Sequence, residues 1–124
     1  MIIKNIFILQ LLIAFILCAS IYPQSITFGR LTTANGLSNN TVYDVLQDQT
    51  GFIWFATDDG LNRFDGYEFK VFRHDPENES SLADNSVWAL CEDGKGKIWI
   101  GTKSGWLNCY DPVIDKFKKW KIKN

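Results

Sequence analysis

Two stretches of the chain decide its fold: LSNNTVYDVLQDQTGFIWFATDDG at residues 37–60 and LADNSVWALCEDGKGKIWIGTKSG at residues 82–105. Aligned at an offset of 45, they are identical at nine of 24 positions, and several other pairs are conservative, such as Tyr43 with Trp88. The match continues past Gly105 after one inserted residue, Trp106. A self-similar period of this length indicates a repeat architecture in which each copy is one supersecondary unit.

Each copy divides into four short β-rich segments that are separated by turn residues. In the first copy we expect strands over 42–47, 52–56, 61–64 and 68–73, and in the second over 87–92, 98–101, 107–110 and 116–122. Four antiparallel strands in about 45 residues are typical of one β-propeller blade. The sequence therefore predicts an all-β fold with two four-stranded antiparallel blades of an incomplete β-propeller, preceded by a hydrophobic signal helix.

The remaining segments set the expected organisation of the chain. Residues 1–20 combine Lys4 with an apolar run from Ile6 to Ala19, which is typical of a secretory signal peptide or, alternatively, an uncleaved N-terminal anchor. We therefore expect an exported, periplasmic product that contacts the membrane only through this segment. The full expected division is a signal peptide at 1–20, an isolated strand at 25–33, blade 1 at 37–73, a linker at 74–81 and blade 2 at 82–122.

Composition argues against several functional classes. The chain has 13 Lys and Arg against 14 Asp and Glu, so it has no basic surplus with which to bind nucleic acid. With His74 as the single histidine and three scattered cysteines, we expect neither a metal nor a cofactor. Cys91 and Cys109 fall on the first and third strands of blade 2, about 9.6 Å apart, which exceeds the reach of a disulfide. We expect both to be free, buried thiols.

The order of motifs in each copy identifies a family resemblance. An Asp-x-x-Gly turn is followed by a hydrophobic-Trp strand, a threonine and a Gly-Leu-x-x-Phe-Asp segment, from which the second copy departs only by Trp106. This unit resembles the two-component regulator propeller repeat. The residues that fill the repeat are Asp48, Gly51, Trp54, Thr57 and Gly60 in the first copy, and Asp93, Gly96, Trp99, Thr102 and Gly105 in the second.

The resemblance implies a function for a longer parent protein. It implies that the chain is the truncated N-terminal periplasmic sensor region of a hybrid two-component histidine kinase, with the remaining propeller blades in the parent. The parent would sense a ligand, with an oligosaccharide as the expected class, and transmit the signal. We expect no independent enzymatic activity, because the sequence shows no kinase or receiver motifs. The alternative is a fragment of a propeller-type lyase or hydrolase.

The aromatic residues and the turn aspartates each allow two interpretations. Tyr43 and Trp88, beside Asn40 and Asn85, are the candidate ligand-binding residues, although packing in the core would also explain the two aromatic rings. We expect the side chains of Trp54 and Trp99 to pack between neighbouring blades. The turn aspartates favour local hydrogen bonding over calcium binding, which needs six to eight oxygen ligands.

Two blades leave both outer sheet faces without a neighbour. A missing interface of several hundred Å², at ~25 cal/mol per Å², withholds on the order of 10 kcal/mol, which is comparable with the stability of a whole domain. We therefore expect the isolated chain to be marginally folded and prone to association.

Overall fold

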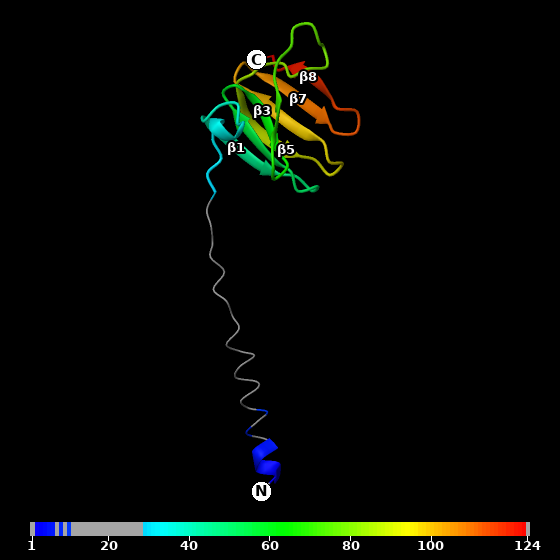
Figure 1. Ribbon diagram of the computed structural model, residues 1–124. Helices are drawn as coiled ribbons and strands as arrows, with labels where there is room; N and C mark the ends of the chain where they lie inside the picture. The colour runs from blue at the N-terminus through cyan, green and yellow to red at the C-terminus, as the bar shows by residue number, and fades with distance from the viewer. Residues whose placement is uncertain (1, 7, 9, 11–28, 124) are drawn as a thin grey trace.

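Two antiparallel four-stranded sheets form the folded part of the chain (Figure 1). The computed structural model describes residues 2–6, 8, 10 and 29–123. The first sheet contains β1 (Val42–Gln47), β2 (Ile53–Thr57), β3 (Gly60–Phe64) and β4 (Phe69–Phe72), and the second contains β5 (Val87–Glu92), β6 (Ile98–Thr102), β7 (Trp106–Asp111) and β8 (Lys116–Lys121). In both sheets each strand pairs with the next one along the chain. The prediction of an all-β fold with two blades is confirmed.

The segment before the first blade contains a short turn. The sequence predicts an isolated strand at 25–33. Residues 25–28 lie outside the described residues, and residues 29–33 form no strand. Thr32 instead caps a 3₁₀ helix, Thr33–Asn35, by accepting a hydrogen bond from the Ala34 N–H. This cap explains why the chain turns here and does not extend.

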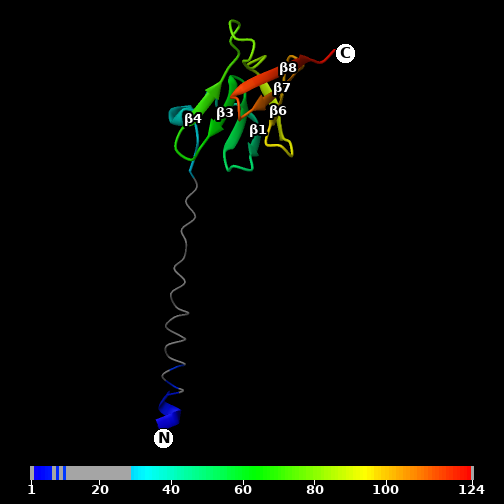
Figure 2. The same cartoon turned by 90° about the vertical axis from the view of Figure 1, so that its right-hand side faces the viewer.

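The expected signal peptide at 1–20 falls mostly outside the described residues. Residues 2–6, 8 and 10, near the end marked N in Figure 2, are helical. Among the described residues, no helix combines the length and the apolar character that crossing a membrane requires.

One hydrophobic core lies between the two sheets. Trp54 on β2 has an exposed fraction of 1%, and its ring lies 5.4 Å from the ring of Tyr110 on β7, measured between centroids. The core is built from one face of each sheet, because side chains alternate between faces along a strand. Its buried members are Trp54, Ala56, Leu61, Leu82, Val87, Ile98, Ile100, Tyr110 and Phe117.

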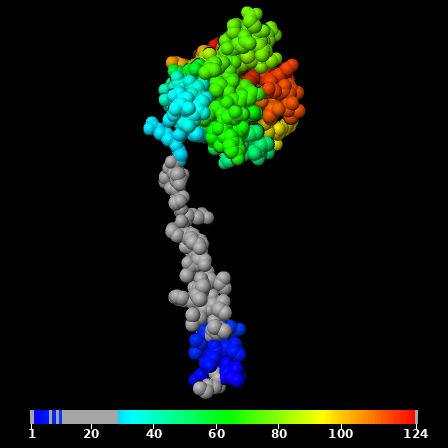
Figure 3. All heavy atoms as spheres, in the orientation of Figure 1, coloured from blue at the N-terminus to red at the C-terminus, as the bar shows by residue number. Residues whose placement is uncertain are grey.

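Polar contacts between the blades add to this core. The Asp44 carboxylate accepts a hydrogen bond from the backbone N–H of Leu90 at 2.9 Å, and the Ser86 hydroxyl donates to Asp58 at 2.7 Å. At the outer strands, Lys70 on β4 forms an ion pair with Asp115 at 2.9 Å. The linker at 74–81 forms a loop that protrudes at one end of the surface (Figure 3).

The two cysteines of blade 2 do not share one environment. Both are free thiols, as predicted, and Cys109 is buried. The expectation that Cys91 is buried is wrong. Cys91 and Cys109 share the face of the second sheet that points away from the first, but Cys91 lies on the edge strand β5 and is exposed, whereas Cys109 lies on the inner strand β7. Burial raises the pKa of the Cys109 thiol above its ordinary value.

Candidate ligand-binding site

Each blade has a β-bulge at the same place in its first strand. On β1 the pairing register shifts between Val42 and Asp44, and on β5 it shifts between Val87 and Ala89. Tyr43 and Trp88 are therefore left without a direct partner on the neighbouring strand. A bulge bends its strand and redirects a side chain, and bulges are frequent beside functional sites.

The two bulged residues lie against each other at the surface. Tyr43 has an exposed fraction of 46% and Trp88 of 47%, and their ring centroids are 5.8 Å apart at an interplanar angle of 49°. The Lys103 ammonium lies 5.9 Å from the centroid of the Trp88 ring. We call Tyr43, Trp88 and Lys103 the aromatic platform. Two exposed rings with a cation beside them can stack on a flat apolar face and bind a neighbouring polar group.

Asn40 and Asn85 are engaged elsewhere. The side-chain oxygen of Asn40 accepts a hydrogen bond from the backbone N–H of Thr33 at 3.0 Å, and that of Asn85 accepts one from the backbone N–H of His74 at 2.7 Å. Both amides thus hold the segment that enters their own blade. The structure brings together the two predicted aromatic residues and uses both asparagine side chains for backbone contacts.

Asp48 and Asp93 organise the turns after the first strand of each blade. Asp48 accepts hydrogen bonds from the backbone N–H groups of Thr50 and Phe52 and, at 2.7 Å, from the indole N–H of Trp54. In blade 2, Asp93 accepts from the backbone of Lys95 and Lys97 and from the indole of Trp99 at 3.0 Å.

These hydrogen bonds lower the pKa of both carboxyl groups. Burial raises the pKa of Asp48, but the hydrogen bonds from Thr50, Trp54 and Phe52 outweigh burial and hold it below its ordinary value. The indole of Trp99 and the backbone N–H groups of Lys95 and Lys97 lower the pKa of Asp93 in the same way. Each ionised carboxylate is therefore stabilised by its own turn.

Acid should weaken the blades through these two turns. A lowered folded-state pKa contributes stability that is present above the unfolded pKa, about 4, and is lost as the pH falls through the folded value. We expect the urea midpoint of the chain to fall as the pH drops below about 4. The double variant Asp48→Asn and Asp93→Asn should start from a lower midpoint and lose less of it. Equal acid-induced losses in both proteins would contradict this role.

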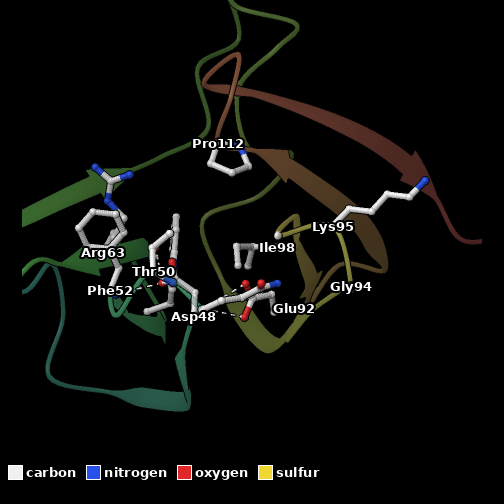
Figure 4. Close-up of a pocket in the computed structure, with 12 residues that line it drawn as sticks. Asp48, Thr50, Phe52, Arg63, Glu92, Gly94, Lys95, Ile98 and Pro112 are labelled. Carbon is white, nitrogen blue, oxygen red and sulfur yellow. Dashed lines mark hydrogen bonds between the residues drawn. The ribbon is translucent and has the colours of Figure 1, made fainter.

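Apart from the aromatic platform, a cavity opens between the two Asp-x-x-Gly turns (Figure 4). Its volume is about 480 Å³, and Asp48, Phe52, Arg63, Glu92 and Pro112 contribute to its walls. Its carboxylates already accept hydrogen bonds, because Glu92 binds the backbone N–H of Gln49 and Asp48 binds its own turn. The Arg63 guanidinium lies 4.6 Å from the centroid of the Phe52 ring. None of the four predicted ligand-binding residues lines this cavity.

The described residues offer no constellation for metal chemistry. Among residues 2–6, 8, 10 and 29–123, no three His, Cys, Asp or Glu side chains are close enough together to hold a metal ion. His74 makes a 2.7 Å hydrogen bond through Nδ1 with the carbonyl of Leu82, so its ring connects the two ends of the linker. The arrangement of exposed rings on a repeated sheet suits binding.

Two four-stranded sheets of matching topology, packed face against face, define a β-propeller-type repeat protein. Residues 36–59 and 81–104 match the family model described as two component regulator propeller. Both matched segments lie in the two sequence repeats whose motifs predicted this resemblance.

Similar proteins come from two bacteria. The chain is 37% identical over 82 residues to Histidine kinase P4 of Formosa agariphila, a match that covers 64% of this chain and 6% of that protein. Two structures of the BT4673 extracellular domain of B. thetaiotaomicron also resemble it. One, described as a hybrid two component system, has a TM-score of 0.53 at 28% identity over 64% of this chain and 11% of that one. The other, described as a one component system, has a TM-score of 0.59 at 23% identity over 74% of this chain and 13% of that one.

The chain thus spans a small part of each of these proteins, 6% of the kinase and 11% to 13% of the solved chains. The two solved structures are extracellular domains, so the similarity to them concerns only that part of their parent proteins.

Proposed function

We propose that the chain forms two adjacent blades of the ligand-sensing propeller of a hybrid two-component histidine kinase. The observation that carries this proposal is the pair of regulator propeller repeats, together with the identity to Histidine kinase P4. Residues 1–20 then direct export, 74–81 joins the blades, and the blades lie in the periplasm. The parent, anchored in the inner membrane, would couple ligand binding to its cytoplasmic kinase.

The proposed ligand is an oligosaccharide that stacks on the aromatic platform. The argument rests on Tyr43 and Trp88, which two separate bulges expose side by side. A sugar ring has an apolar C–H face and polar hydroxyl edges, so it suits two rings with Lys103 beside them. Asn40 and Asn85 then support the site indirectly, by holding the segments that enter the two bulged strands.

Removing either ring should weaken sugar binding. Stacking on an aromatic ring contributes about 0.5–1.5 kcal/mol, so Tyr43→Ala or Trp88→Ala should raise Kd by a factor of about 2 to 13. The measurement is the change in tryptophan fluorescence or the calorimetric heat when defined neutral and uronate-containing oligosaccharides are added. Tyr67→Ala is the matched control, because Tyr67 is 94% exposed and lies away from the platform.

The same experiment separates binding from catalysis. A sensor blade should leave the added oligosaccharides intact, whereas a fragment of a propeller-type lyase or hydrolase would release shorter products. Binding that survives both substitutions would remove the platform from the proposal, and binding of no sugar at all would remove the ligand class.

A further inference from the structure

The cavity beside Arg63 lies between two blades that are both present in the chain. One of its walls comes from blade 1, including the turn after β1, and the other comes from blade 2, including the turn after β5. Further blades of a longer chain would pack on the outer sheet faces, so they would not occupy this space. Its volume of about 480 Å³ suits a small molecule, because ligand cavities measure about 300–1,000 Å³.

The two carboxylates on the walls differ in their remaining capacity to accept hydrogen bonds. Asp48 accepts four, from the backbone N–H and the hydroxyl of Thr50, the backbone N–H of Phe52 and the indole of Trp54. A carboxylate has about four acceptor sites, so those of Asp48 are all used. Both oxygens of Glu92 share one donor, the backbone N–H of Gln49, at 3.2 and 3.1 Å. Glu92 can therefore still accept from a hydroxyl group.

The guanidinium of Arg63 is held in place by aromatic rings. It lies 4.6 Å from the centroid of the Phe52 ring and 5.7 Å from that of Trp54, and the residue is half-buried. Figure 4 shows the Arg63 side chain beside the ring of Phe52. Contacts with the faces of rings leave the N–H groups at the edge of the guanidinium plane free to point elsewhere.

Arg63 has no carboxylate of its own. In the part of the chain that the structure describes, it takes part in no ion pair. The hydrogen bonds from Tyr110 and Lys70, together with the nearby charge of Arg63, hold the pKa of Asp115 below its ordinary value. However, that carboxylate pairs with Lys70 at 2.9 Å and accepts from the Tyr110 hydroxyl at 2.7 Å. The positive charge of Arg63 is therefore left without a partner.

The architecture of the repeat does not require an arginine at this position. Arg63 pairs with Trp54 across β2 and β3, and in blade 2 the residue that pairs with Trp99 in the same way is Cys109. Blade 2 forms the same four strands without the cation. A half-buried arginine that the fold does not need, beside a cavity, points to a ligand.

We propose that the cavity beside Arg63 binds a small hydroxylated carboxylic acid. Arg63 pairs with the carboxylate of the ligand, because a planar guanidinium can donate two parallel hydrogen bonds to it. Glu92 accepts a hydrogen bond from a hydroxyl group of the same ligand. A ligand with both groups uses the free donors and the free acceptor of the cavity together. The site is separate from the aromatic platform, since neither Tyr43 nor Trp88 lines it.

The first test titrates the full chain with glucuronate, glucose and malate and follows the backbone amide signals by NMR. Glucose has the sugar ring without the carboxylate, and malate is a hydroxy acid without a ring, so the pair identifies the source of the carboxylate. We expect glucuronate, malate or both to shift the amides of 48–52 and 93–96 in a saturable way, and glucose to leave them unchanged.

Three results of this titration would overturn the proposal. Saturable shifts around Tyr43 and Trp88 alone would do so while supporting the aromatic platform. Shifts of the two turns by glucose as large as those by the acids would remove the carboxylate from the argument. The third is the absence of a saturable shift with either acid.

The second test measures Kd for the acid that binds, using substitutions in the full chain. Arg63→Gln should raise Kd at least about tenfold, because a hydrogen bond to a charged group is lost. Arg63→Lys keeps the charge without the fork and should raise Kd less. If Arg63→Gln shows no cooperative urea transition, Arg63→Lys provides the comparison.

Arg30→Gln is the matched control for Arg63→Gln. It makes the same chemical change at an exposed arginine that does not line the cavity, so Kd should not change. An unchanged Kd in both Arg63 variants, or an equal rise in the Arg30 variant, would overturn the proposal.

Discussion

Trp54→Ala should unfold or severely destabilise the chain, with an expected loss of about 3–5 kcal/mol in the free energy of unfolding. Trp54 is the largest side chain of the core, and its indole N–H donates to Asp48 at 2.7 Å. Its removal leaves a cavity between the sheets and deprives the Asp48 carboxylate of a donor. Because a domain has only about 5–15 kcal/mol in total, urea denaturation should show a much lower midpoint or no transition.

Trp99→Ala is the control that the repeat itself supplies. Trp99 makes the same indole hydrogen bond to Asp93 and the same stacked pair, but no neighbouring blade covers it. We expect a loss of roughly 1–2 kcal/mol when both variants are measured at a protein concentration low enough to keep the chain monomeric. The difference between the variants isolates the contribution of the inter-blade interface. Equal losses would mean that the interface contributes little.

The blades could be predicted from sequence because their signals are local and occur twice. Each unit contains a turn with the spacing of Asp48 and Gly51, followed by a strand around Trp54. The same residues recur 45 positions later, so both copies indicate the same four strands. A turn residue such as Asp48 binds its own backbone, so its role depends on neighbours within six residues. A short apolar run alone can be a strand or part of a buried helix, and the repeated four-segment pattern favours the strand.

The candidate site could be predicted only in part. Tyr43 and Trp88 were found because they are equivalent aromatic residues, yet the bulge that exposes them depends on pairing between strands, which sequence alternation does not reveal. Asn40 and Asn85 were grouped with them by proximity in sequence, whereas their amides bind backbone groups of earlier segments. The prediction that Cys91 is buried was wrong because burial on one face of blade 2 also depends on the place of the strand in the sheet, and Cys91 lies on the edge strand β5.

Lys103 and the cavity beside Arg63 had no sequence signal. Lys103 lies 15 residues after Trp88 and reaches its ring only because β5 and β6 are paired. The cavity collects residues from turns of both blades, so its existence depends on how the sheets meet. Predicting the position of Lys103 or the cavity would have required knowledge of how the strands and the two blades are arranged in space.

The second large effect is expected at Gly60, where β3 begins. Its φ is +104°, and a Cβ atom added there would lie 2.5 Å from the carbonyl oxygen of Phe72. Backbone cannot move aside as a flexible side chain can, and the Gly60 N–H is also held by the carbonyl of Asn85 in the other blade. Gly60→Ala should therefore cost at least about 3 kcal/mol, from the left-handed conformation and the clash together.

Gly105→Ala provides the matched comparison for Gly60→Ala, because Gly105 is its equivalent in the second repeat. Gly105 also has a positive φ, +79°, but an added Cβ would meet nothing within 4 Å. Its cost should be limited to the left-handed conformation, about 1–2 kcal/mol. Both changes restrict the unfolded chain to the same degree, so the difference between their urea midpoints measures the clash with Phe72. Equal losses of stability in the two variants would contradict the close contact between Gly60 and the Phe72 carbonyl on β4.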